Sequence, residues 1–121
     1  MQRKGNTISR RSQAANLETI GIDMGGTLWA TSIRDWESGK TSYYALKDKD
    51  GESKEQRVFR LVTERLNVGK QVSVYYEAGR YGFWPARELR KRGAEVHILP
   101  INKLKVIMCG KTIKTDKLDA K

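Results

Sequence analysis

The hydrophobic pattern of this 121-residue chain changes period near residue 53, and that change limits the folds open to it. Before it, apolar segments at residues 17–24, 27–35 and 41–47 read as strands joined by short turns. The stretch "IGIDMGGTLWATSI" contains the first of these turns, Gly25-Gly26. Three strands in succession with tight turns predict an antiparallel meander.

After residue 53 the apolar positions between 58 and 66 fall at helical spacing. Ser53 and Gln56 form a capping-box pattern at the start of this helix, and Gly69 is a natural stop. A strand at residues 71–78, a helix at about 83–92 closed by Gly93, and a strand at 95–100 follow. Thr115 is placed to cap one more helix at the end of the chain.

The order β-β-β-α-β-α-β-α predicts an α/β fold in which a mixed five-stranded sheet is covered by helices, because the two crossovers need parallel pairing. Ribonuclease-H-like (RuvC-like) domains use this order, with the first strand central and the fourth beside it. We therefore expect a basic flexible arm at residues 1–16 and one folded domain at residues 17–121.

The formal charge of +10 lies at the two ends of the chain. Residues 1–16 carry +4, residues 17–77 carry −1 and residues 78–121 carry +7. A neutral middle argues against general solubilisation and favours a polyanionic partner, nucleic acid first. The basic residues expected to contact it are Arg80, Arg87, Lys111, Lys114 and Lys117.

A single cysteine, Cys109, excludes an internal disulfide and a cysteine-based zinc site. His97 is the one histidine and lies in an apolar run, which favours a packed strand residue over a catalytic one. No segment has transmembrane length and the amino terminus lacks a signal-peptide core, so no membrane contact and a cytoplasmic location are expected.

Four acids have unusual surroundings. Asp23 interrupts an apolar strand, Glu77 ends another, and Asp116 and Asp119 share one face of the last predicted helix. If the first and fourth strands are neighbours and the last helix crosses their ends, four carboxylates meet there. Their repulsion would be relieved by two Mg²⁺ or Mn²⁺ ions about 4 Å apart, a pairing that supports phosphodiester cleavage. Alone, Asp116 and Asp119 are more simply a solvated helix start, and Glu77 a strand-end surface acid. The metal site is the favoured interpretation once all four acids fall where the fold would gather them.

"GIDM", "YEAGRYGFW" and "KTDKLDAK", in this order and spacing, resemble the amino-terminal domain of DEDD transposases of the insertion-sequence-110 type, a group that includes the Piv-type DNA invertases. The resemblance runs from about Thr19 to the last residue. It implies a RuvC-like nuclease domain in which all four acids hold magnesium for DNA strand cleavage during transposition or inversion. It also implies a structured guide RNA as partner and a homo-oligomer for the full-length protein.

Two departures from the family pattern bear on this interpretation. Family members carry a second, carboxyl-terminal domain with a serine nucleophile, whereas this chain ends two residues after Asp119. A truncated product, a fragment or one piece of a split gene is therefore expected, with enzyme activity assigned to the full-length transposase. Gly25-Gly26-Thr27 also differs from the usual residues after the first aspartate. Two alternatives stay open: a sugar kinase or ATPase fragment with an Asp-x-Gly-Gly-Thr phosphate loop, and an inactive nucleic-acid-binding module. Phe83 and Trp84, beside Arg80 and Arg87, suit stacking on the bases of DNA or RNA, but packing of the second helix onto the sheet is the favoured interpretation.

Overall fold

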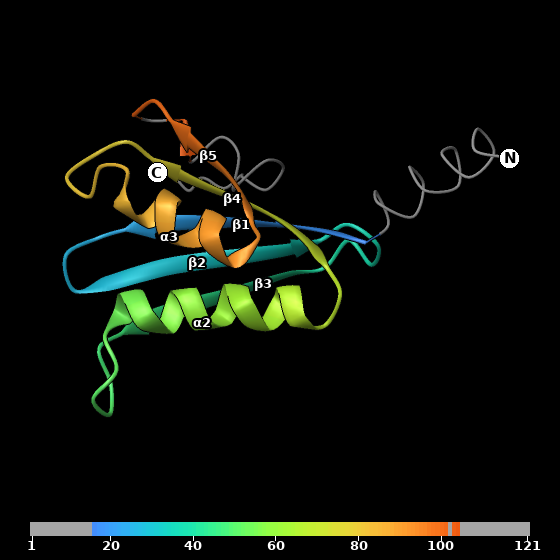
Figure 1. The fold of residues 1–121 in the computed structure, drawn as a ribbon, viewed down its shortest axis with the longest axis horizontal. Coiled ribbons are helices and arrows are strands. Elements are labelled where there is room, and N and C mark those ends of the chain that lie inside the picture. Colours follow the sequence, from blue (N-terminus) through green and yellow to red (C-terminus); the bar gives the residue numbers. More distant parts are fainter. Residues whose placement is uncertain (1–15, 102, 105–121) are drawn as a thin grey trace, which may run out of the picture.

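The five strands form one mixed sheet in the order β3-β2-β1-β4-β5, shown in Figure 1. The computed structural model describes residues 16–101, 103 and 104. The predicted helix after Thr115 and nearly all of the basic arm lie outside these residues. The elements are β1 (Leu17–Met24), β2 (Leu28–Asp35), β3 (Thr41–Lys47), α2 (Lys54–Asn67), β4 (Gln71–Glu77), α3 (Trp84–Arg92) and β5 (Glu95–Leu99).

Strand β1 is central, with β2 antiparallel on one side and β4 parallel on the other. Strand β3 continues the antiparallel meander and β5 pairs parallel with β4. The predicted α/β class and mixed five-stranded sheet are therefore confirmed, and β1 is central with β4 beside it, as predicted. Strand β1 begins directly after Asn16, whose carbonyl accepts from Gln71 N–H at 3.0 Å.

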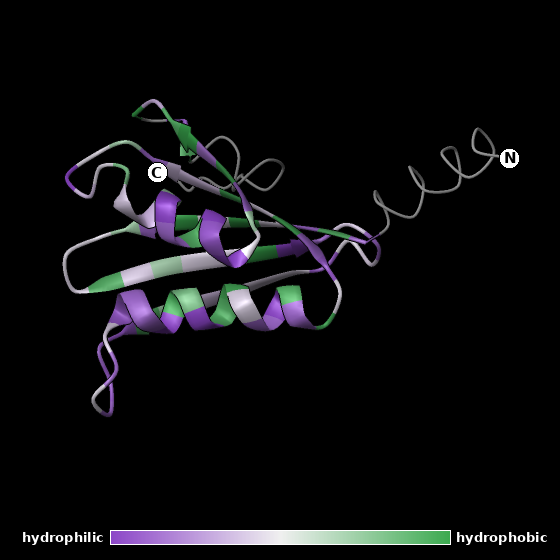
Figure 2. Cartoon of the chain, viewed as in Figure 1, coloured by the Kyte–Doolittle hydropathy of each residue, from purple (hydrophilic) through white to green (hydrophobic). Residues whose placement is uncertain are grey.

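Both helices cover the same face of the sheet (Figure 1). In Figure 2 hydrophobic and hydrophilic residues alternate along α2, as its single buried face requires. Alternation along the strands sends every second side chain toward the helices. The residues buried there include Ile20, Ile22, Val74 and Tyr76 from β1 and β4, and Val58, Val62 and Leu89 from the helices.

The two helices begin in different ways. The predicted capping box of α2 is present: Ser53 Oγ accepts from Gln56 N–H at 3.0 Å, and Gln56 Oε1 accepts from Ser53 N–H at 2.9 Å. Helix α3 has proline in its first turn but no side-chain cap from its own N-cap residue. It ends at Gly93, whose φ of 111° is left-handed as glycine allows. None of the helices in the described part of the chain is long and apolar enough to cross a membrane.

Candidate functional site

Asp23 and Glu77 stand side by side at the carboxyl ends of two neighbouring parallel strands. Ile22 of β1 is in register with Tyr76 of β4, so the next residues along the two strands are this pair of acids. Ile22 and Tyr76 are fully buried beneath the helices, and alternation sends Asp23 and Glu77 to the opposite face. Adjacent strands lie about 4.8 Å apart, which brings both carboxylates within reach of one cation.

Asp23 is exposed at the end of β1. Its partner across the antiparallel pair with β2 is Ala30, whose small side chain leaves the carboxylate unobstructed on that side. The turn that follows is held by Gly25 N–H, which lies 3.1 Å from the Asp23 carbonyl and 3.2 Å from the Leu28 carbonyl. A Cβ on Gly25 would come within 3.0 Å of that Leu28 oxygen, so only glycine fits there without a shift.

Glu77 is half-buried and one of its carboxylate oxygens already has a partner. Leu104 N–H donates to Glu77 Oε2 at 3.1 Å, which orients the carboxylate. Leu104 is itself buried, so the segment after β5 folds back over the end of β4. Among the described residues no donor reaches Glu77 Oε1, so within this part of the chain that oxygen keeps its lone pairs for another ligand.

The loop between β4 and α3 is tied to the same edge of the sheet by two tyrosines. Tyr81 OH donates to the Gly25 carbonyl at 3.0 Å and thereby joins this loop to the β1–β2 turn. Tyr76 OH donates to the Gly82 carbonyl at 2.7 Å and accepts from Ala86 N–H at 3.3 Å. Tyr76 thus caps α3 from the sheet, and its burial raises the pKa of its hydroxyl.

Basic and aromatic side chains surround this loop. Arg80 and Arg87 are exposed, and the Arg80 guanidinium lies 5.9 Å from the centre of the Tyr81 ring. Phe83 is 64% exposed, so the prediction that it packs α3 onto the sheet is wrong: it precedes the first helical turn and faces solvent. Trp84 is 39% exposed and packs edge-on against Phe59 of α2 at 5.7 Å, so this contact joins the two helices rather than α3 and the sheet.

His97 is a packed strand residue, as its apolar neighbours predict, although its side chain is 41% exposed. On the face that carries Asp23 and Glu77, its ring stacks on Tyr75 at 4.7 Å with a 16° interplanar angle. Its Nε2 lies 3.0 Å from Glu95 Oε2. The His97 imidazole is therefore engaged by Tyr75 and Glu95, and it lies on β5, the strand next to the one that carries Glu77.

The donor chemistry at the strand ends fits a hard divalent cation. Carboxylate oxygens are the ligands that Mg²⁺ and Mn²⁺ prefer, and Asp23 and Glu77 supply them on one face. Within residues 16–101, 103 and 104, no group of three or more histidine, cysteine or acidic side chains is placed to hold a metal. Asp116 and Asp119, like Lys111, Lys114 and Lys117, lie outside the described residues.

The sequence indicates the two acids but not the contacts that hold them. Tyr81 and the Leu104 amide act on partners 56 and 27 residues away. Tyr76 carries a weak signal, because it is a polar aromatic at a position where alternation demands burial, and a buried tyrosine hydroxyl needs a partner.

No known family model matches the chain, and no curated protein matches it in sequence. Among solved structures the chain is similar to the RuvC structure of Thermus thermophilus, with a TM-score of 0.48 and 18% sequence identity. The similarity covers 77% of this chain and 68% of that one.

Proposed function

We propose that this chain is the nuclease domain of a DNA transposase or site-specific recombinase of the DEDD type. The observation that carries the proposal is the register of β1 and β4, which sets Asp23 and Glu77 next to each other on one face. The spacing of "YEAGRYGFW" and "KTDKLDAK" supports it by supplying the other two acids, Asp116 and Asp119. A structured guide RNA and a homo-oligomeric full-length protein belong to the same proposal.

The proposed site takes two Mg²⁺ or Mn²⁺ ions, held by Asp23, Glu77, Asp116 and Asp119. Such ions supply a hydroxide or alkoxide nucleophile at neutral pH and stabilise the leaving oxygen of a phosphodiester. The chain's own residues do the positioning. Leu104 N–H fixes the orientation of the Glu77 carboxylate, and Tyr81 holds the Gly25 turn beside Asp23. In this proposal the exposed Arg80 and Arg87 neutralise the phosphates of the strand being cut.

Metal binding tests the acid pair directly. Mg²⁺ and Mn²⁺ are titrated into the chain while its melting temperature and binding heat are followed. We expect stabilisation that is lost in Asp23→Asn and in Glu77→Gln. Glu95→Gln is the matched control, because Glu95 is also an exposed acid on this sheet face but lies four strand positions before Leu99, the residue in register with Glu77. Equal metal responses in all four proteins would overturn the proposed site.

Nucleic-acid binding separates the alternatives. We expect salt-dependent DNA or RNA binding that weakens in Arg80→Ala and Arg87→Ala, and is retained in Lys70→Gln at the opposite end of the sheet. Nucleic-acid binding that is unchanged in a chain showing no response to metal would favour the inactive binding module. Stabilisation by ATP without nucleic-acid binding would favour the kinase fragment. Against that reading, Gly25 N–H is already used inside the turn and is not free for a phosphate.

A further inference from the structure

Strand β3 forms the edge of the sheet, and no strand among the described residues pairs with its outer side. Edge strands usually carry a device against further pairing, such as proline, a bulge or a central lysine. Thr41–Lys47 reads TSYYALK, with no proline or glycine and its one charge at the last position. Tyr43 is 67% exposed and Tyr44 is 40% exposed, and Ala45, the next residue of the strand, is exposed as well.

The hydrogen bonds of the meander show which backbone groups of β3 face outward. Trp36 N–H donates to Leu17 of β1, and Asp35 N–H donates to Lys40 at the start of β3. Even-numbered positions of β3 therefore bond to β2 in the observed register. The N–H and C=O groups of Thr41, Tyr43, Ala45 and Lys47 point to the free edge.

This edge is complementary to itself in one antiparallel register. When Tyr44 lies opposite Tyr44 of a second copy, Tyr43 pairs with Ala45 and Thr41 with Lys47 of that copy, all through outward-facing groups. The two Tyr44 residues then form a pair without direct hydrogen bonds, where side chains come closest. In the same register Lys40 stands opposite Asp48 of the second copy, twice in each dimer.

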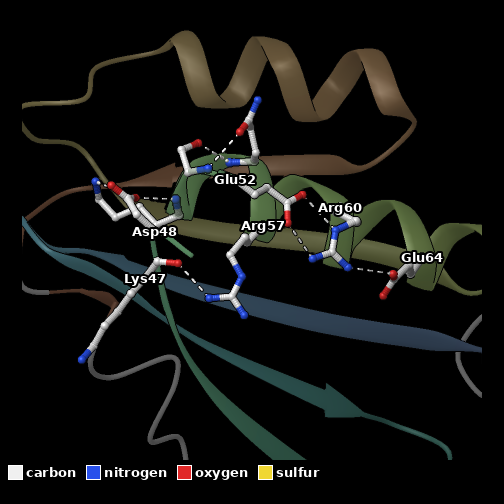
Figure 3. Close-up of polar contacts among 9 residues, drawn as sticks. Lys47, Asp48, Glu52, Arg57, Arg60 and Glu64 are labelled. Atoms are coloured by element: carbon white, nitrogen blue, oxygen red, sulfur yellow. Dashed lines mark hydrogen bonds and ion pairs between the residues drawn. The ribbon is translucent and has the colours of Figure 1, made fainter. Parts of the chain in front are cut away.

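The residues flanking β3 are available for these contacts. Asp48, whose side chain is 72% exposed, lies just past the strand end beside α2 in Figure 3. Its Oδ1 accepts from Lys54 N–H at 2.8 Å, which fixes the carboxylate in place. Arg57 donates to the Lys47 carbonyl at 2.8 Å (Figure 3), and that oxygen keeps a second lone pair for Thr41 N–H of the second copy.

We propose that two copies of this chain associate through antiparallel pairing of their β3 strands, centred on Tyr44, to give one continuous sheet. The surface is separate from the Asp23–Glu77 site, because β3 and β4 are at different sides of the central strand β1. The proposal therefore stands or fails independently of the nuclease assignment.

Proline substitutions test the edge without relying on side chains. Ala45→Pro removes an outward N–H and leaves the bonds to β2 intact, so we expect a folded monomer where the native chain shows concentration-dependent dimerisation in sedimentation. Tyr44→Pro removes an inward N–H and is expected to lower the melting temperature instead. A native chain that stays monomeric at all concentrations, or an Ala45→Pro variant that dimerises like the native chain, overturns the proposal.

Charge reversal tests the register. Lys40→Glu places like charges opposite each other at both ends of the dimer, and Asp48→Lys does the same. We expect each variant alone to be weakened as a dimer, and an equimolar mixture of the two to dimerise, since every Lys40–Asp48 contact then joins opposite charges. Melting curves check that Asp48→Lys remains folded. A mixture no more dimeric than its components overturns this register.

A cysteine on the symmetry axis gives a covalent readout. In a Cys109→Ser background, Tyr44→Cys places two cysteines opposite each other with Cα atoms about 4.5 Å apart, within disulfide range. Mild oxidation is expected to cross-link this variant. Ser42→Cys lies two residues off the axis and is expected to stay uncross-linked under the same conditions. Equal cross-linking of the two variants would contradict the proposed pairing.

Discussion

The guanidinium group of Arg65 binds both carboxylate oxygens of Glu18. Arg65 Nε and Nη2 donate to Glu18 Oε1 and Oε2, each at 2.8 Å. Glu18 is only 2% exposed, at the start of β1 on the face that the helices cover, whereas the Arg65 side chain is 32% exposed in the last turn of α2. The pair joins α2 to the central strand, and its hydrogen bond raises the pKa of Arg65.

Truncating the arginine is expected to destabilise the protein strongly. Arg65→Ala leaves a buried carboxylate without its partner, which costs about 3–5 kcal/mol of unfolding free energy. Urea denaturation at neutral pH measures the loss. In Glu18→Gln/Arg65→Met the buried charge is absent, so most of the stability should return. An Arg65→Ala variant within about 1 kcal/mol of the native chain would show that Glu18 finds water or another donor.

Tyr76 is expected to make stability depend on alkaline pH. Its pKa is raised by burial, so the folded state holds the phenolic proton more tightly than the unfolded chain does. The resulting stability is fully present below pH 10.0, the ordinary pKa, and is lost as pH rises through the raised value. At pH 8, Tyr76→Phe is expected to cost about 1–3 kcal/mol, because Gly82 and Ala86 each lose a partner.

Urea midpoints between pH 8 and pH 11 check this linkage. The gap in unfolding free energy between native chain and Tyr76→Phe should narrow as pH rises, because only the native chain has the buried hydroxyl to ionise. Tyr43→Phe is the matched control, since Tyr43 is 67% exposed and should track the native chain throughout. A constant gap across this range would contradict the raised pKa.

The periodicity of apolar residues is sufficient to predict the main strands and helices of this fold. Alternation around Ile20 and Ile22 identifies β1, and the change to helical spacing after Ser53 identifies α2 with its cap. Because a crossover helix forces parallel pairing, the same pattern places β4 beside β1. The adjacency of Asp23 and Glu77 follows from that placement, so half of the predicted acid set could be located from sequence.

The contacts that hold the site could not be predicted in this way. Leu104 N–H reaches Glu77 only because the chain after β5 turns back across the sheet edge, and no local pattern records that turn. The exposure of Phe83 depends on where α3 begins. That start is set by the distant Tyr76 hydroxyl, which meets Ala86 N–H in the first turn. Such loop geometry arises from tertiary packing.

The two glycines after Asp23 should respond differently to the same substitution. A Cβ at Gly25 would lie 3.0 Å from the Leu28 carbonyl, whereas one at Gly26 meets nothing within 4 Å. Gly25→Ala is therefore expected to cost about 1–3 kcal/mol through strain. Gly26→Ala is expected to be neutral or to stabilise by up to about 1 kcal/mol, since it restricts the unfolded chain. Thermal denaturation of both variants gives the comparison, and equal effects would mean that the turn adapts at Gly25.

Helix α2 begins with a capping box in which Ser53 is the N-cap residue. Ser53 sits in an extended conformation, φ −74° and ψ 161°, with its hydroxyl on Gln56 N–H. Ser53→Ala leaves that N–H without a side-chain acceptor and is expected to lower the unfolding free energy by about 0.5–2 kcal/mol. Ser53→Gly should cost only a few tenths of a kcal/mol, because glycine lets water reach the helix end. Denaturant titration ranks the two variants, and a glycine variant less stable than the alanine variant would contradict a capping role for the hydroxyl.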